Sequence, residues 1–79
     1  MKTGNTYIVR KSIFNFKVGQ ILTLIRYGYQ AYYGEYNFMF TDMENRNICV
    51  VLRGDDEEDM KIYHHLNEYF EESNDNTNL

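Results

Sequence analysis

The stretch ILTLIRYGYQAYYGEYNFMF, residues 21–40, decides the fold that this sequence predicts. Its first seven residues are rich in β-branched and aromatic side chains, which favour a β-strand. Both faces of that strand are apolar, so it is either central in a sheet or bent so that its two ends serve different layers of a small barrel. Gly28 stands where a bulge or a sharp bend is expected. Gly34 marks a hairpin turn, and residues 36–41 alternate between aromatic and other side chains, which predicts a second strand.

Further strands are predicted on both sides of this hairpin, and a helix follows them. Residues 6–14 and residues 48–53 alternate well enough for strands. Asp55 or Asp56 can cap a helix, and apolar side chains then recur every three or four residues over 59–72. The predicted class is α+β: a small antiparallel meander of four to five strands with one C-terminal amphipathic helix. A half-open barrel closed by the helix is the preferred architecture, and a plain four-stranded sheet with the helix across it is the alternative.

Length and composition indicate a single small domain. We place it at residues 1–72, with residues 73–79 as a disordered polar tail. An apolar share of 43% is too high for a disordered chain. A lone cysteine, Cys49, excludes an intramolecular disulfide framework and fits a reducing compartment. No apolar run reaches the length of a signal peptide or a membrane span, so we expect a cytoplasmic protein without membrane contact.

The charges of the chain are divided unevenly along the sequence. Residues 1–34 carry five cations and no acid, whereas residues 35–79 carry twelve acids and three cations, for a net charge of −4. Such asymmetry can mark a basic binding face. We favour the alternative that the two halves pack together and that their charges complement each other.

The titratable residues do not form a motif for catalysis or for metal binding. His64 and His65 are adjacent on the predicted helix and point about 100° apart, so they cannot chelate one ion together. The acidic run at residues 55–59 suits a helix N-terminus and lacks the ligand spacing of a calcium loop. Cys49 is expected to be a buried strand thiol. We therefore predict a protein that is not an enzyme, with no catalytic residue, no metal and no cofactor.

The segment YIVRKSIFNFKVGQILTLIRYGYQAYYGEYNFMF, with ICVVLR and an acidic helix ending in NEYFEE after it, resembles a family of short bacterial proteins of unknown function. The shared pattern is a first strand, a turn at Val18 and Gly19, a strong strand, an aromatic hairpin, one further strand and a helix. The helix ends in a stretch like residues 67–70, which is one residue shorter here. The resemblance covers about residues 7–72. It implies an SH3-like β core with a C-terminal helix, and it carries no known activity.

Tyrosines around the predicted hairpin turn form the candidate site. They outnumber what so thin a core can hide, and each has a polar end that prefers water or a partner. We expect two or more of them to be exposed at one edge, beside two cations. The candidate contact residues are Tyr27, Tyr29, Tyr32, Tyr33, Arg26 and Lys17.

Two functions could use such a surface. The first is contact with an unidentified protein or peptide, or with a second copy of the chain in a homodimer, because tyrosine and arginine are enriched where binding energy concentrates. The second is a single-stranded nucleic-acid binding barrel, in which tyrosines stack on bases and the basic N-terminal half holds phosphates. A third possibility is that the tyrosines only cap a marginal core. We favour protein contact, since the acidic half would repel a polyanion. Cations that scatter or pair with the acidic helix, beside tyrosines that stay exposed, would strengthen that preference.

Overall fold

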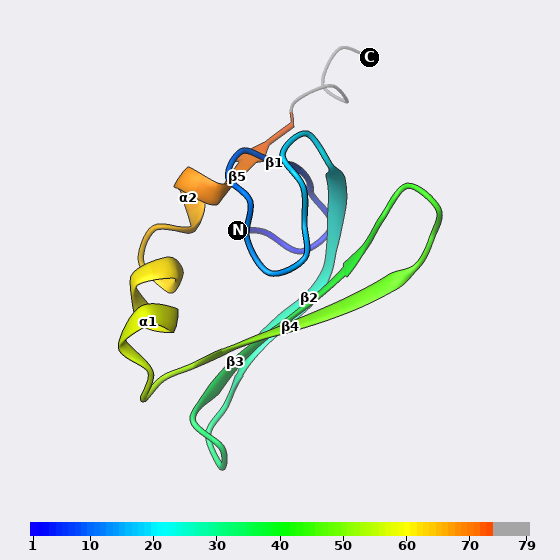
Figure 1. Ribbon diagram of the computed structural model, residues 1–79. Helices are drawn as coiled ribbons and strands as arrows, with labels where there is room; N and C mark the ends of the chain where they lie inside the picture. Colours follow the sequence, from blue (N-terminus) through cyan, green and yellow to red (C-terminus); the bar gives the residue numbers. More distant parts are fainter. Residues whose placement is uncertain (74–79) are drawn as a thin grey trace.

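The computed structural model describes residues 1–73, which form five strands and two short helices (Figure 1). The strands are β1 (Thr6–Val9), β2 (Ile21–Gln30), β3 (Glu35–Thr41), β4 (Asn47–Arg53) and β5 (Phe70–Glu72). The helices, α1 (Glu57–Tyr63) and α2 (Leu66–Tyr69), lie between β4 and β5 in the chain. All strand pairs are antiparallel, in the order β4-β3-β2-β1-β5. The predicted α+β class with an antiparallel sheet is confirmed. Over residues 1–73 no pairing joins β4 to β5, so the sheet is open.

β2 is the long strand on which the sheet is built. Its first part pairs with β1, and from Thr23 to Gln30 it pairs with β3. The register with β3 shifts between Leu24 and Arg26, and such a bulge bends a strand and increases its twist. The bend predicted at Gly28 therefore lies at Ile25 instead, while Gly28 pairs in register with Asn37. The side chains of β2 that face the core have even numbers before the bulge and odd numbers after it. Since side chains of a strand alternate between its two faces, this switch requires one extra residue, which is Ile25.

The core lies on one face of the sheet and follows the predicted alternation of the strands. Its buried members are Tyr7, Val9, Ile13, Phe16, Leu22, Leu24, Phe38, Phe40, Val50, Leu52 and Phe70. The prediction that Cys49 is a buried strand thiol is wrong, because its side chain is exposed. It lies between the inward residues Ile48 and Val50 of β4, so the alternation of the strand turns it away from the core.

The predicted helix over residues 59–72 is wrong in its second half. α1 begins after Asp56, one of the two predicted caps, whose carboxylate accepts hydrogen bonds from the N–H groups of Glu58 and Asp59 at 2.9 and 3.1 Å. α1 ends at Tyr63, and a turn separates it from the single turn of α2.

The end of the predicted helix is the strand β5, which pairs with β1. Phe70 is buried there, with its ring centroid 5.6 Å from that of Phe40 and 6.2 Å from that of Phe16. The N–H of Arg10 also donates to the carbonyl of Tyr69 at 2.7 Å. The backbone pairing with the outer edge of β1 and the burial of the Phe70 ring thus outweigh the helical spacing of the apolar residues. Of the predicted tail, residue 73 continues the pairing with β1, and residues 74–79 lie outside the described part of the chain.

Cations of the N-terminal half pair with acids of the C-terminal segment. Arg10 forms an ion pair with Glu71, and the Nζ of Lys11 lies 3.1 Å from a carboxylate oxygen of Glu68. We predicted that the charges of residues 1–34 and of residues 35–79 complement each other, and for Arg10 and Lys11 this is confirmed. Both pairs are about half exposed, so each contributes little to stability.

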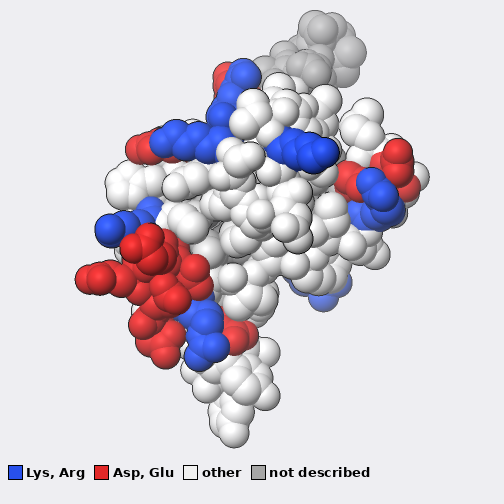
Figure 2. Space-filling view, viewed as in Figure 1, with Lys and Arg blue, Asp and Glu red and all other residues white. Residues whose placement is uncertain are grey.

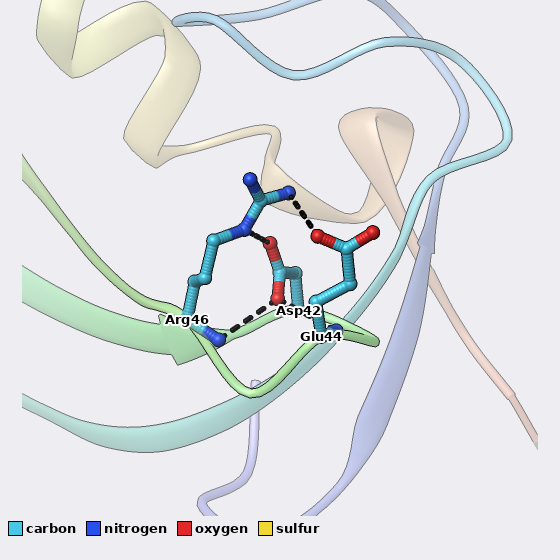
Figure 3. A network of polar contacts seen from close by, with 3 residues as sticks. All are labelled: Asp42, Glu44 and Arg46. Carbon is cyan, nitrogen blue, oxygen red and sulfur yellow. Dashed lines mark hydrogen bonds and ion pairs between the residues drawn. The ribbon is translucent and has the colours of Figure 1, made fainter.

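A single carboxylate organises the β3–β4 loop (Figure 3). One oxygen of Asp42 accepts the N–H groups of Glu44 and Arg46 at 2.9 Å each, and the other accepts the Nε of Arg46 at 2.8 Å. The hydrogen bond from the Arg46 backbone is the main cause that lowers the pKa of Asp42 below its ordinary value of 3.8.

This lowered pKa predicts a pH dependence of stability. Because Asp42 binds protons less readily in the folded chain than in the unfolded one, its charged form stabilises the fold above pH 3.8, and that contribution is lost as the pH falls through the lowered pKa. Asp42→Asn should therefore lose less stability than the unchanged chain when acidified from about pH 5 to about pH 2. Urea denaturation at both pH values measures the difference. Equal losses would contradict the assignment.

Candidate functional site

The β2–β3 hairpin projects from the body of the molecule and carries the predicted tyrosines (Figure 1). We call Tyr27, Tyr29, Tyr32 and Tyr33 the tyrosine surface. Their exposed fractions are 47%, 57%, 87% and 63%. The expectation that two or more of them would be exposed is confirmed. Their role as partner contacts stays a prediction.

Two of the four tyrosines lie on the same face of the sheet as the core. Tyr27 is opposite Phe38, and their rings stack with centroids 5.5 Å apart. Tyr29 is opposite Tyr36, with ring centroids at 4.8 Å. The bulge at Ile25 places both on this face, because without the extra residue the odd-numbered positions would point away from the core. The tyrosine surface is therefore a continuation of the core face beyond the region that the core covers.

Helix α1 packs against this part of the hairpin. The rings of Tyr36 and Tyr63 stack with centroids 4.0 Å apart, which joins α1 to β3. Burial raises the pKa of Tyr63 above 10, and the nearby hydroxyls of Tyr36 and Tyr27 add to the effect.

The other two tyrosines lie in the loop at the tip of the hairpin. The rings of Tyr32 and Tyr33 meet edge to face at 4.8 Å. Gly34 closes the loop at φ +64°, a left-handed conformation that glycine adopts without strain, and its N–H donates to the carbonyl of Gln30 at 2.8 Å. Its own carbonyl accepts the N–H of Gly54 at 2.7 Å, which ties the tip to the start of the α1 segment.

A cleft of about 460 Å³ lies between the tip and α1. It is lined by Tyr29, Tyr32, Tyr33, Gly34, Tyr36, Gly54, Asp55 and Met60. Figure 2 shows the acidic side chains of the α1 region gathered beside the uncharged end of the molecule. These acids belong to residues 55–59, the run that supplies the cap and the first turn of α1. The tyrosine surface therefore has this acidic run beside it, with cationic side chains among the acids (Figure 2).

A second groove of about 450 Å³ lies along the hairpin. Arg26, Gly28 and Gln30 line it from β2 together with Tyr27 and Tyr29, and Cys49 lines it from β4. Arg26 is opposite Met39 in the sheet, and no ion pair joins its guanidinium to a carboxylate of residues 1–73. Arg26 is thus close to the tyrosines in the chain but faces the other side of the sheet.

The structure does not bring Lys17 to the tyrosine surface. Lys17 is exposed in the turn before β2, where its N–H donates to the side-chain oxygen of Gln20 at 3.1 Å. The tyrosines lie at the far end of β2, and a strand of ten residues spans about 30 Å. The predicted contact set is therefore divided into a tyrosine surface, an outward-facing Arg26 and a remote Lys17.

The unpaired backbone beside the tyrosines could not be predicted from the sequence. β1 covers only the first part of β2, and among residues 1–73 no strand pairs with the outer edge of Ile25–Gln30. Thr6 pairs with Thr23 and Ile8 with Ile21 in an antiparallel register, so only residues before Thr6 could cover the edge beyond Leu24. The predicted first strand, residues 6–14, lacks those residues, and in the structure they follow β2 only as far as Leu24.

Two further classes of feature are absent from the described part of the chain. Residues 1–73 contain no cluster of three or more histidine, cysteine, aspartate or glutamate side chains with the geometry to hold a metal ion. In the same residues no helix has the length and apolar character needed to cross a membrane.

Comparison with known proteins adds a structural relative. No protein-family model and no curated protein matches the chain. A similar fold occurs in a solved structure from the mobile metagenome of Vibrio cholerae, described as an integron cassette protein, with a TM-score of 0.80. The match covers 92% of this chain and 86% of the other at 22% sequence identity. At that identity the likeness shows the fold alone.

Proposed function

We propose that this chain is a non-enzymatic, cytoplasmic protein-interaction module whose contact site is the tyrosine surface. The observation that carries the proposal is the exposure of all four tyrosines on a hairpin that projects beyond the core. Exposed aromatic groups gathered in one patch are typical of sites where proteins meet. Tyrosine suits such a site, since it buries a large rigid ring and keeps a hydroxyl for a hydrogen bond.

The arrangement of charge favours a protein partner over a nucleic acid. Arg10 and Lys11 already pair with acids, and Lys17 is remote from the tyrosines. The acidic run of residues 55–59, in which Asp55 is paired with Arg53, lies beside the tyrosine surface and would repel phosphates. A partner that lays a neutral or cationic segment over the tyrosines meets no such repulsion.

The same proposal includes an SH3-like reading of the β core. The strand order β4-β3-β2-β1-β5 and the bulge in β2 support it, because a bent central strand lets one sheet fold into two packed halves. Small barrels of this kind commonly bind peptides through aromatic grooves. The cleft between the hairpin tip and α1 offers such a groove. The tyrosines in its lining are Tyr29, Tyr32, Tyr33 and Tyr36.

Affinity capture from the source cell tests the proposed contact. The bait is the full chain, and its matched variants are Tyr32→Ser with Tyr33→Ser, and Met43→Ser. Met43 is an exposed apolar residue in the β3–β4 loop, so its replacement changes the surface to a similar degree elsewhere. We expect the tyrosine variant to lose its partners by tenfold or more, about 1.4 kcal/mol per tenfold, and the Met43 variant to keep them. Retention of every partner by the tyrosine variant would refute the proposal, as would salt-sensitive binding of a single-stranded oligonucleotide.

A further inference from the structure

The outer edge of β2 presents unpaired backbone from Ile25 to Gln30. The N-terminal segment covers β2 only as far as Leu24, whose carbonyl accepts the N–H of Gly4 at 2.6 Å and whose N–H donates to the carbonyl of Asn5 at 3.0 Å. Beyond Leu24, β3 is the one strand that pairs with β2 within residues 1–73. In an antiparallel pair, alternate residues turn their N–H and C=O away from the partner. The edge therefore offers backbone donors and acceptors to another strand.

Gly28 lies in the middle of this edge, and nothing inside the molecule requires a glycine there. Its φ is outside the left-handed region, and a Cβ at this position would meet no atom within 4 Å. A glycine inside a strand weakens that strand and often marks a place where another backbone approaches. Gly28 is therefore a place on this edge where a second backbone has room to approach.

We propose that this edge pairs with the same edge of a second copy, so that the chain forms a two-fold symmetric dimer through an antiparallel β2–β2 contact centred on Gly28. The inference rests on the proposed function, because it names the partner of the same hairpin. Two-fold dimers are the commonest oligomers, and their contact is made by one patch on both subunits.

In a dimer centred on Gly28, the side chains along the edge of one copy complement those of the other. With Gly28 opposite Gly28 of the second copy, Tyr27 lies opposite Tyr29 of the second copy, and Arg26 lies opposite its Gln30. Aromatic cross-strand pairs stabilise a sheet, and no like charges face each other. A two-fold axis at Arg26 would instead place two guanidinium groups opposite each other. All inward residues stay on one side, so the core faces of the two copies form one continuous surface.

The length of the free edge matches the same register. Ile25 lies opposite Ala31 of the second copy, the first residue after β2. The paired segment then fills the edge from the end of the N-terminal cover to the hairpin loop. It also places the tip of each hairpin, with Tyr32 and Tyr33, beside the N-terminal segment of the other copy.

A register-specific cross-link tests the proposal. Gly28→Cys in a Cys49→Ser background leaves one cysteine per chain, at a position with room for a side chain. Directly opposite residues of an antiparallel pair have Cα atoms about 4.5–5.5 Å apart, which is within the range of about 4.4–6.8 Å that a disulfide spans. We expect this variant to form a covalent dimer on oxidation. Gln30→Cys in the same background should not, because residue 30 faces residue 26 of the other copy.

Sedimentation of the unchanged chain gives the second measurement. We expect a species of twice the 9.5 kDa monomer mass that dissociates on dilution. A monomer at every concentration, or equal cross-linking of the two cysteine variants, would overturn the inference. The proposed function would survive that result if captured partners were still lost with Tyr32→Ser and Tyr33→Ser. The opposite result is also distinguishable. If the dimer is specific to Gly28→Cys but the tyrosine variant still captures every partner, the dimer inference stands and the proposed contact with other proteins is refuted.

Discussion

Phe70→Ala is expected to lower the free energy of unfolding by about 3–5 kcal/mol, the range for removing a buried aromatic ring. Phe70 is the buried residue of β5, and its ring contacts those of Phe16 and Phe40. A small domain has roughly 5–15 kcal/mol of total stability, so the variant should be close to unfolding. Urea denaturation followed by near-ultraviolet circular dichroism measures the loss.

The matched control is Phe14→Ala. Phe14 is 40% exposed and contacts the same Phe16 ring from outside the core, with centroids 5.9 Å apart. Its removal should cost less than about 1.5 kcal/mol, in the range of partly buried groups. Equal losses for the two variants would contradict the placement of residue 70 in the core, and with it the replacement of the predicted helix by β5.

Tyr36→Ala is the second large effect, with an expected loss of about 2–3 kcal/mol from burial and from aromatic pairing. Tyr36 is partly buried, stacks on Tyr63 of α1 and contacts Tyr29 across the sheet. Its removal should loosen α1 from the hairpin while the rest of the core stays packed. Urea denaturation gives the free energy, and amide hydrogen exchange in α1 shows where protection is lost.

Tyr36→Phe is the control for this effect. It keeps the ring that stacks on Tyr63 and removes only the hydroxyl. We expect its stability to lie within about 0.5 kcal/mol of the unchanged chain, as for a change that preserves packing. A loss as large as that of the alanine variant would mean that the hydroxyl, and not the ring stack, holds α1 against the sheet.

The strands around the aromatic hairpin could be predicted because one face of each is buried. Alternation with a period of two placed Phe38 and Phe40 in the core, and the structure places them there. The same alternation contained two signals that the prediction did not use. Leu22 and Leu24 are inward at even positions and Tyr27 is inward at an odd one, which requires the bulge at Ile25. Likewise, Cys49 alternates with inward residues of β4 and is therefore exposed.

The C-terminal strand and the free edge could not be predicted from local patterns. Apolar spacing of three and four over residues 59–72 fits a helix, but pairing with β1 and burial of the Phe70 ring make residues 70–72 a strand. The free edge depends on where β1 begins, because Thr6 pairs with Thr23 and the residues before it follow β2 only as far as Leu24. Both are consequences of tertiary contacts between segments that are distant in the sequence. The exposure of the tyrosines, in contrast, followed from the small size of the core.

The proposed function requires that the tip tyrosines be held at the surface for contact with a partner and be dispensable for folding. The free energy of unfolding of the double variant Tyr32→Ser and Tyr33→Ser tests this most directly, beside that of the unchanged chain. We predict a difference within about 0.5 kcal/mol per substitution, as for exposed residues outside the core. A loss of more than about 2 kcal/mol would show that the two rings stabilise the fold, and it would contradict the claim.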